Sequence, residues 1–148
     1  MKTPMLALLL LCAPLAHAGI PGEAECRTWT RQMIDPREDA CDDLCPQAEK
    51  FDGYDYRKGL AEAFRTRAGL SRFFAYTGRS SIMGAGGDAQ ACTLHALLMH
   101  WGDARYAAVL SKQAPDVRAR VVGLLDYAGI QRFEPRYPKT HALAVHED

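Results

Sequence analysis

Cysteine and histidine are the residues whose types and spacing could support chemistry in this chain. Cys92 and His95 are three residues apart in the run RSSIMGAGGDAQACTLHALLMHW, residues 79–101. Residues three apart on a helix share one side, so a thiolate and an imidazole there could contact one metal ion. Four of the five cysteines lie beyond the first 18 residues: Cys26, Cys41, Cys45 and Cys92.

The same residues allow two kinds of metal site. Zinc could be held by Cys41, Cys45, Cys92 and His95, and a copper-type site could add Met99. Both sites need free thiols. An even number of cysteines in an exported chain instead indicates disulfides. We therefore predict two disulfides and no cofactor, with metal binding through Cys92 and His95 as the alternative.

The pairing of the four cysteines has three possible forms. Cys41 and Cys45 are four residues apart, and on a regular helix their sulfur atoms are awkwardly placed for bonding to each other. We expect each of them to pair elsewhere, one with Cys26 and the other with Cys92. Such bridges would fasten the N-terminal segment to the rest of the domain.

A glycine-rich turn, residues 84–87, precedes the helix that carries His95. A phosphate-binding P-loop needs a lysine after its last glycine and a strand before the turn, and neither is present. We expect a flexible joint instead. No Gly-x-Ser-x-Gly elbow surrounds Ser81, so a hydrolase site built from Ser81, His95 and Arg79 is only a third possibility. No catalytic residue is predicted.

Charge is unevenly distributed along a chain whose formal net charge is zero. Residues 35–55 carry eight acidic side chains against two basic ones, and residues 57–79 carry six basic side chains against one acidic one. The overall balance gives no general attraction to nucleic acid or anionic lipid. The local imbalance predicts a charge-polarised surface that could steer a protein partner.

Aromatic residues lie where the two charged segments meet, in the run FDGYDY at residues 51–56. Aromatic side chains inside a charged rim are common anchors at protein interfaces. The predicted protein-binding residues are Phe51, Tyr54, Tyr56, Arg65, Arg72 and Arg79.

The N-terminal residues have the pattern of an export signal. Lys2 precedes an apolar run, and Ala16-His17-Ala18 matches a signal-peptidase site. We expect residues 1–18 to be removed and residues 19–148 to form one domain in the periplasm or outside the cell. The apolar run is too short to span a membrane. Lipoprotein processing at Cys12 is an alternative, although it requires a small residue before the cysteine and Leu11 is at that position.

Helical periodicity dominates the rest of the chain, and no alternating strand pattern is present. We expect an all-α fold of five to seven short helices, arranged as a small bundle or a HEAT-like array. The stretch 94–101 is apolar on nearly all sides, which predicts the innermost helix. The C-terminal tail is broken by prolines, so we expect it to be loosely structured, with one turn of helix at 138–145. The other predicted helices are 23–34, 37–45, 56–78, 89–101, 104–113 and 115–129.

Two segments of the chain resemble known helical proteins. Residues 102–127 resemble a HEAT-like helical hairpin, which implies a surface for binding other proteins. The stretch 70–127 is similar to exported proteobacterial helical proteins of no known activity. The residues that carry this resemblance are Phe73-Phe74-x-Tyr76-Thr77, Gly84-Ala85-Gly86-Gly87, and Gly102-Asp103 followed by Tyr106, Val109 and Leu110.

The sequence therefore predicts an exported, non-enzymatic helical protein that binds a periplasmic protein through its charge-polarised surface. Its role would be that of an inhibitor, an immunity-type protector or an assembly factor. The balanced charge gives no reason to expect nucleic acid as a partner, and we expect no membrane span. A metal-binding periplasmic protein is the alternative.

Overall fold

The computed structural model describes residues 22–144, and within that range the chain is all-helical, with no strand. The all-α class predicted from the sequence is confirmed. The predicted signal segment 1–18 lies outside the described residues. Seven helices have eight residues or more: α1 (Glu23–Ile34), α2 (Cys45–Asp52), α3 (Tyr56–Arg65), α4 (Arg67–Arg79), α5 (Ala85–Trp101), α6 (Asp103–Leu110) and α7 (Pro115–Tyr127). Two four-residue helices follow, α8 (Phe133–Arg136) and α9 (Pro138–His141).

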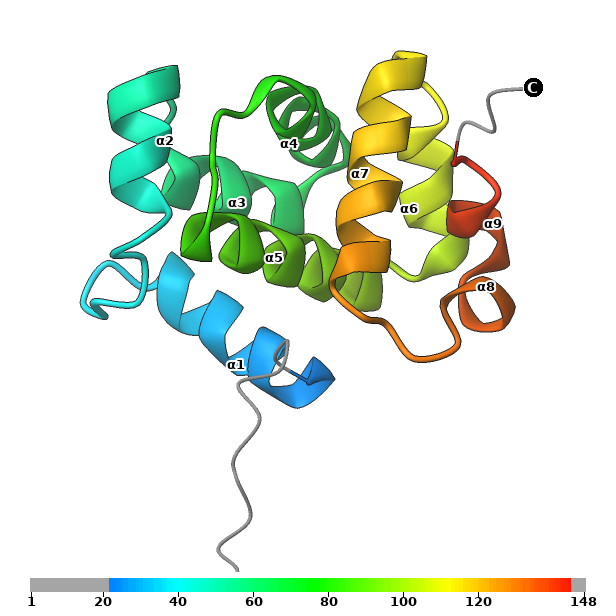
Figure 1. Ribbon diagram of the computed structural model, residues 1–148, viewed down its shortest axis with the longest axis horizontal. Helices are drawn as coiled ribbons and strands as arrows, with labels where there is room; N and C mark the ends of the chain where they lie inside the picture. The colour runs from blue at the N-terminus through cyan, green and yellow to red at the C-terminus, as the bar shows by residue number, and fades with distance from the viewer. Residues whose placement is uncertain (1–21, 145–148) are drawn as a thin grey trace, which may run out of the picture.

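Helix α5 runs through the middle of the molecule and is contacted by α1, α3, α6 and α7 (Figure 1). Every residue from Ala89 to Leu98 is buried. A helix that is apolar on all sides must be surrounded by other elements, and the remaining helices supply that cover. The prediction that this stretch is the innermost helix is confirmed. No helix within residues 22–144 has both the length and the apolar character needed to cross a membrane.

Local signals set several helix boundaries. The Asp55 side chain accepts a hydrogen bond from the Lys58 backbone N–H at 3.0 Å, so Asp55 caps α3. Pro115 opens α7, where the predicted helix 115–129 begins. Helix α5 begins earlier than predicted, because Gly84 takes a φ of +59° and lets the chain enter the helix at Ala85.

The predicted helix 56–78 is two helices, separated at Thr66. The Thr66 hydroxyl accepts from the Gly69 N–H at 2.9 Å and caps α4. Gly69 lies where α3 and α4 approach each other most closely. A Cβ atom there would be 2.2 Å from the Glu62 carbonyl oxygen. The glycine therefore permits the close packing of the two helices.

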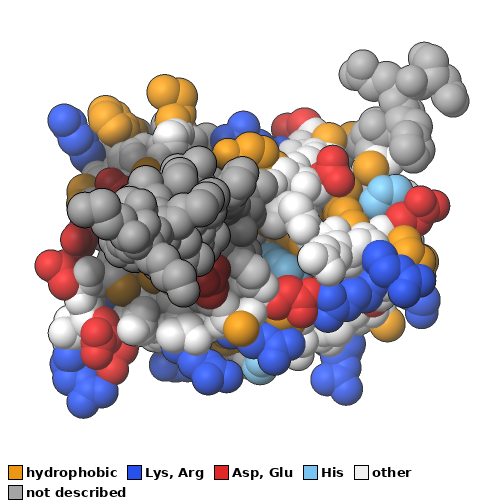
Figure 2. All heavy atoms as spheres, turned by 60° about the horizontal axis from the view of Figure 1, so that its bottom comes forward, with side chains coloured by type: hydrophobic (Ala, Val, Ile, Leu, Met, Phe, Trp, Pro, Cys, Tyr) orange, Lys and Arg blue, Asp and Glu red, His pale blue; other side chains and the backbone are white. Residues whose placement is uncertain are grey.

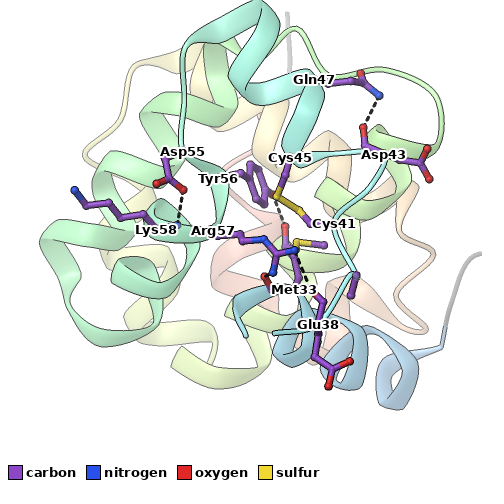
Figure 3. Close-up of a disulfide and its surroundings, with 12 residues drawn as sticks. Met33, Glu38, Cys41, Asp43, Cys45, Gln47, Asp55, Tyr56, Arg57 and Lys58 are labelled. Carbon is purple, nitrogen blue, oxygen red and sulfur yellow. Dashed lines mark hydrogen bonds between the residues drawn. A yellow bond between two sulfur atoms is a disulfide. The ribbon is translucent and has the colours of Figure 1, made fainter. Parts of the chain in front are cut away.

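The prediction of a helix at 37–45 ended by Pro46 is wrong. Residues 35–44 form turns, and Pro46 lies in the first turn of α2, where its missing N–H costs nothing. The Arg57 guanidinium donates to the backbone carbonyls of Met33, Asp35 and Glu38 (Figure 3). These hydrogen bonds use carbonyl groups at the end of α1 and in the segment that follows it, and they hold that segment against α3.

The predicted cysteine pairing is also wrong. Cys41 bonds to Cys45, with Cα atoms 5.3 Å apart, and Cys26 bonds to Cys92, with Cα atoms 5.1 Å apart (Figure 3 shows the first pair). The expected pairing required Cys41 and Cys45 to share one regular helix. Cys41 instead lies in the turn before α2, where the chain brings the two sulfur atoms together.

The C-terminal segment is packed rather than loose as far as the structure describes it. Phe133, Tyr137 and Thr140 are buried, and the Asp103 carboxylate accepts from the backbone N–H groups of Lys139 and Thr140. Helices α6 and α7 form within residues 102–127, as expected. Helix α7 packs mainly on α4 and α5 rather than on α6.

Candidate functional site

The predicted aromatic cluster separates into exposed and buried members. Phe51, at the end of α2, is 61 % exposed, and Tyr56 is only 1 % exposed in the core. Tyr56 is therefore a correction to the predicted binding set, because its ring cannot reach a partner. Tyr54 is half-buried and stacks on Tyr76, with ring centroids 3.6 Å apart. Burial raises the pKa of Tyr54 to about 12.

The three predicted arginines also differ in position. Arg79 lies over the Tyr76 ring, 5.3 Å from its centroid. Arg72 is paired with Glu62 at 2.9 Å on the α3–α4 surface. Arg65 is at the opposite end of α3 from Tyr56, about 13 Å away along the helix axis. Tyr54 and Arg72 therefore line one hollow, and Arg79 contacts the Tyr76 ring on which Tyr54 stacks. Phe51 lies at the end of α2, and Arg65 is apart.

A loop next to these residues is held rigidly by α2. The Asp52 carboxylate accepts from the Ser81 N–H at 3.1 Å and from the Tyr76 hydroxyl at 2.8 Å. Burial opposes ionisation of Asp52, but these hydrogen bonds still hold its pKa below the ordinary value. The Gln47 amide binds both the N–H and the carbonyl of Met83.

Met83 is a functional candidate on this side of the molecule that was not expected from the sequence. Its side chain is 74 % exposed although its backbone is fixed. The sequence feature that could have identified it is a large apolar residue inside a serine- and glycine-rich loop. We name the surface formed by Phe51, Tyr54, Arg72, Arg79 and Met83 the α2–α4 face.

Part of the predicted charge polarity does not reach the surface, because a charged side chain bonds to backbone groups inside the fold. Arg57, from the basic segment, points inward to backbone carbonyls. Asp39, Asp42 and Asp43, from the acidic segment, remain exposed in the 35–44 turn. A hydrogen bond with Asp39 and the like charge beside it raise the pKa of Asp42. An acidic turn therefore persists near α2, whereas the basic side chains are more dispersed.

Cys92 and His95 do not form the metal site considered above. The Cys92 sulfur is bonded to Cys26, so it offers no thiolate. Within residues 22–144, no three His, Cys, Asp or Glu side chains are grouped to share a metal ion. The hydrolase alternative also fails geometrically: Ser81 is held at Asp52, whereas His95 is about 15 Å along α5 from the start of that helix and faces α1.

His95 instead belongs to a buried cluster at the start of α1. It is 2 % exposed, and its Nε2 lies 3.6 Å from Glu23 Oε1. Neither ring nitrogen has a hydrogen-bond partner among the described residues. Burial lowers the pKa of His95, and the attraction of Glu23 only partly opposes that effect. Arg136 pairs with the Glu23 carboxylate through both of its terminal nitrogens, which lowers the pKa of Glu23.

A groove lies between α1 and the C-terminal half of α5 and has a volume of about 400 Å³. Figure 2 shows the molecule from the α1 side, where basic side chains gather along the lower edge of the surface. This groove was not expected from the sequence. The sequence feature that could have predicted it is the spacing of four α1 positions, which fall on one helix face. The lining residues are Arg27, Thr30, Arg31, Ile34, Phe64, Ala96, Met99 and His100.

No family model, curated protein or solved structure matches this chain.

Proposed function

We propose that this is an exported helical protein that binds another protein through the α2–α4 face, as an inhibitor, immunity-type protector or assembly factor does. One observation carries the proposal: Phe51 and Met83 are both exposed on backbone that hydrogen bonds and helix packing hold in place. Exposed apolar side chains on a fixed backbone lose little conformational entropy when a partner covers them.

The neighbouring groups fit the same role. Protein interfaces are enriched in aromatic residues, methionine and arginine, and the α2–α4 face combines all three. Arg79 and Tyr54 both contact the Tyr76 ring, so a partner would meet an ordered surface. The exposed Asp39, Asp42 and Asp43 add a region of negative charge that could steer a basic partner surface.

Two features support an exported location. The pattern of residues 1–18 is that of a cleaved signal. The two disulfides are compatible with an oxidising compartment, since such bonds are rare where thiols are kept reduced.

The binding proposal is tested by cross-linking and affinity purification from periplasmic extract of the producing cell. The wild-type protein should retain a specific partner, and the double variant Phe51→Ser/Met83→Ser should retain about tenfold less or lower still, because central apolar anchors dominate interface energy. Circular dichroism should show the same helix content in both proteins.

A matched pair of arginine variants distinguishes binding through the α2–α4 face from a general effect of surface charge. Arg79→Ser should weaken partner retention, whereas Arg105→Ser, an exposed arginine on α6, should not. Equal retention by the wild type and the Phe51→Ser/Met83→Ser variant would show that the α2–α4 face is not the interface. Failure of the wild type to retain any partner would count against protein binding itself.

A further inference from the structure

The groove between α1 and α5 has an apolar floor that reaches its open side. Ile34 comes from α1, Phe64 from the end of α3, and Ala96 and Met99 from α5. The Phe64 ring meets the His100 ring edge-on, with centroids 5.0 Å apart, and both residues line the groove. A volume of about 400 Å³ falls within the range of small-molecule sites, roughly 300–1,000 Å³.

The rim of this groove carries positive charge without a counter-anion. Arg27 and Arg31 are one helical turn apart on α1, and both are exposed. Neither forms an ion pair with a carboxylate within residues 22–144. The Arg27 Nε instead donates to the Met99 sulfur at 3.1 Å. A thioether is a weak acceptor, so this guanidinium has no strong partner in the free protein.

A buried hydroxyl lies between the two arginines. Thr30 lines the groove, is 1 % exposed, and its Oγ1 has no hydrogen-bond partner among the described residues. Buried polar groups are nearly always paired, and leaving one unpaired costs free energy. The hydroxyl itself is enclosed by protein, so a ligand anion in the groove would meet the two guanidinium groups, Arg27 and Arg31.

We propose that the α1–α5 groove binds an anionic amphiphile with a single acyl chain and a carboxylate head, the chemistry of a long-chain fatty acid. The carboxylate is held by Arg27 and Arg31. The chain lies over Ile34, Phe64 and Met99. Methionine and aromatic side chains adapt readily to a flexible chain, and two arginines match a carboxylate better than any neutral head.

Titration of the purified, oxidised protein with palmitate tests this assignment. The Trp101 ring is 5.7 Å from the His100 ring, so tryptophan fluorescence should report occupancy of the groove. We expect saturable binding. Arg27→Ala/Arg31→Ala should weaken it by about tenfold or more, because each arginine makes a charge-assisted hydrogen bond. Arg105→Ala, the control on α6, should bind as the wild type does.

Two further probes define the ligand class. Methyl palmitate keeps the chain and lacks the charge, so it should bind at least tenfold more weakly than palmitate. A short acidic peptide lacks the chain and should not displace palmitate. The proposal is overturned if the wild type does not bind palmitate, if the ester binds equally well, or if the peptide displaces the fatty acid, which would make the groove a protein-docking site.

Discussion

Two buried tyrosines, Tyr56 and Tyr106, differ in whether the hydroxyl group has a hydrogen-bond partner. The Tyr56 hydroxyl lies 2.6 Å from Thr93 Oγ1, whereas the Tyr106 hydroxyl is buried without a hydrogen-bond partner among the described residues. Tyr56→Phe should therefore lower the free energy of unfolding by about 1 kcal/mol. Tyr106→Phe should leave it unchanged or raise it, because the removed hydroxyl has no bond to lose.

Urea denaturation of the two tyrosine variants makes the comparison, and each serves as the control for the other. Both changes remove one hydroxyl from a fully buried ring, so the two variants lose a similar amount of packing. A larger destabilisation for Tyr106→Phe than for Tyr56→Phe would contradict the hydrogen bonding described above.

His95 should make stability depend on pH in mildly acidic solution. Burial lowers its pKa below the ordinary value of 6.5, so the unfolded chain binds this proton more readily than the folded protein does. The stabilisation is complete above pH 6.5 and is lost as the pH falls toward the folded-state pKa. The pKa of Glu23 is lowered from 4.5, so its own contribution is lost only below that pH.

The measurement is the free energy of unfolding at pH values between 6.5 and 4.5, the interval set by those two ordinary values. The wild type should lose stability as the pH falls, and His95→Gln should lose less. His100→Gln, which removes an exposed histidine from the same helix, is the control. If the unfolding free energy of His95→Gln and of the wild type changes with pH at the same rate, another group is responsible for the pH dependence.

At the scale of elements, the contact of α3 with α4 depends on one glycine. Gly69→Ala would place a Cβ atom 2.2 Å from the Glu62 carbonyl, so the two helices must separate. We expect a loss of about 1–3 kcal/mol in unfolding free energy. Gly87→Ala, in the first turn of α5 with nothing within 4 Å, should stabilise by up to about 1 kcal/mol. Thermal unfolding of both variants tests the opposite signs.

The elements that the sequence predicts well are those defined by local chemistry. Asp55 and Pro115 mark helix starts by hydrogen bonding and ring geometry within a few residues, and the apolar residues 94–98 are buried as predicted. The 35–44 turn was not predictable in this way. It is held by Arg57, a residue of another helix, and no local propensity encodes that contact.

The candidate surfaces were predictable to a lesser extent. Phe51 lies outside the core as predicted, but nothing in the run FDGYDY distinguishes Tyr54 from the buried Tyr56, because exposure depends on which face of α3 meets α5. Arg27 and Thr30 belong to one helix face by spacing alone. What spacing cannot show is that α5 leaves a groove beside that face.

At the scale of the whole molecule, the two disulfides should differ in their effect on stability. The Cys26–Cys92 bond spans 66 positions of the chain, and the Cys41–Cys45 bond spans four. In the chain-entropy model the first contributes about 4 kcal/mol and the second about 2 kcal/mol. Cys26→Ala/Cys92→Ala should therefore destabilise the protein more than Cys41→Ala/Cys45→Ala does, as measured by denaturation in urea.

A peptide map under non-reducing conditions provides the reference for those variants. It should contain the 26–92 and 41–45 linked peptides in the wild type. Each double variant should keep the other bond. A map with Cys26 linked to Cys41 or Cys45 would refute the connectivity on which the comparison rests.

The order of the cysteines along the chain has a consequence for biogenesis. The 41–45 bond is nested inside the 26–92 bond, so the native partner of Cys26 is the last cysteine to be synthesised. An oxidase that acts on cysteines as they emerge would join Cys26 to Cys41 first. Thiol–disulfide exchange must then correct that link, a process that takes seconds to hours. The yield of native protein should therefore depend on a disulfide isomerase, and cells lacking one should accumulate the mispaired form.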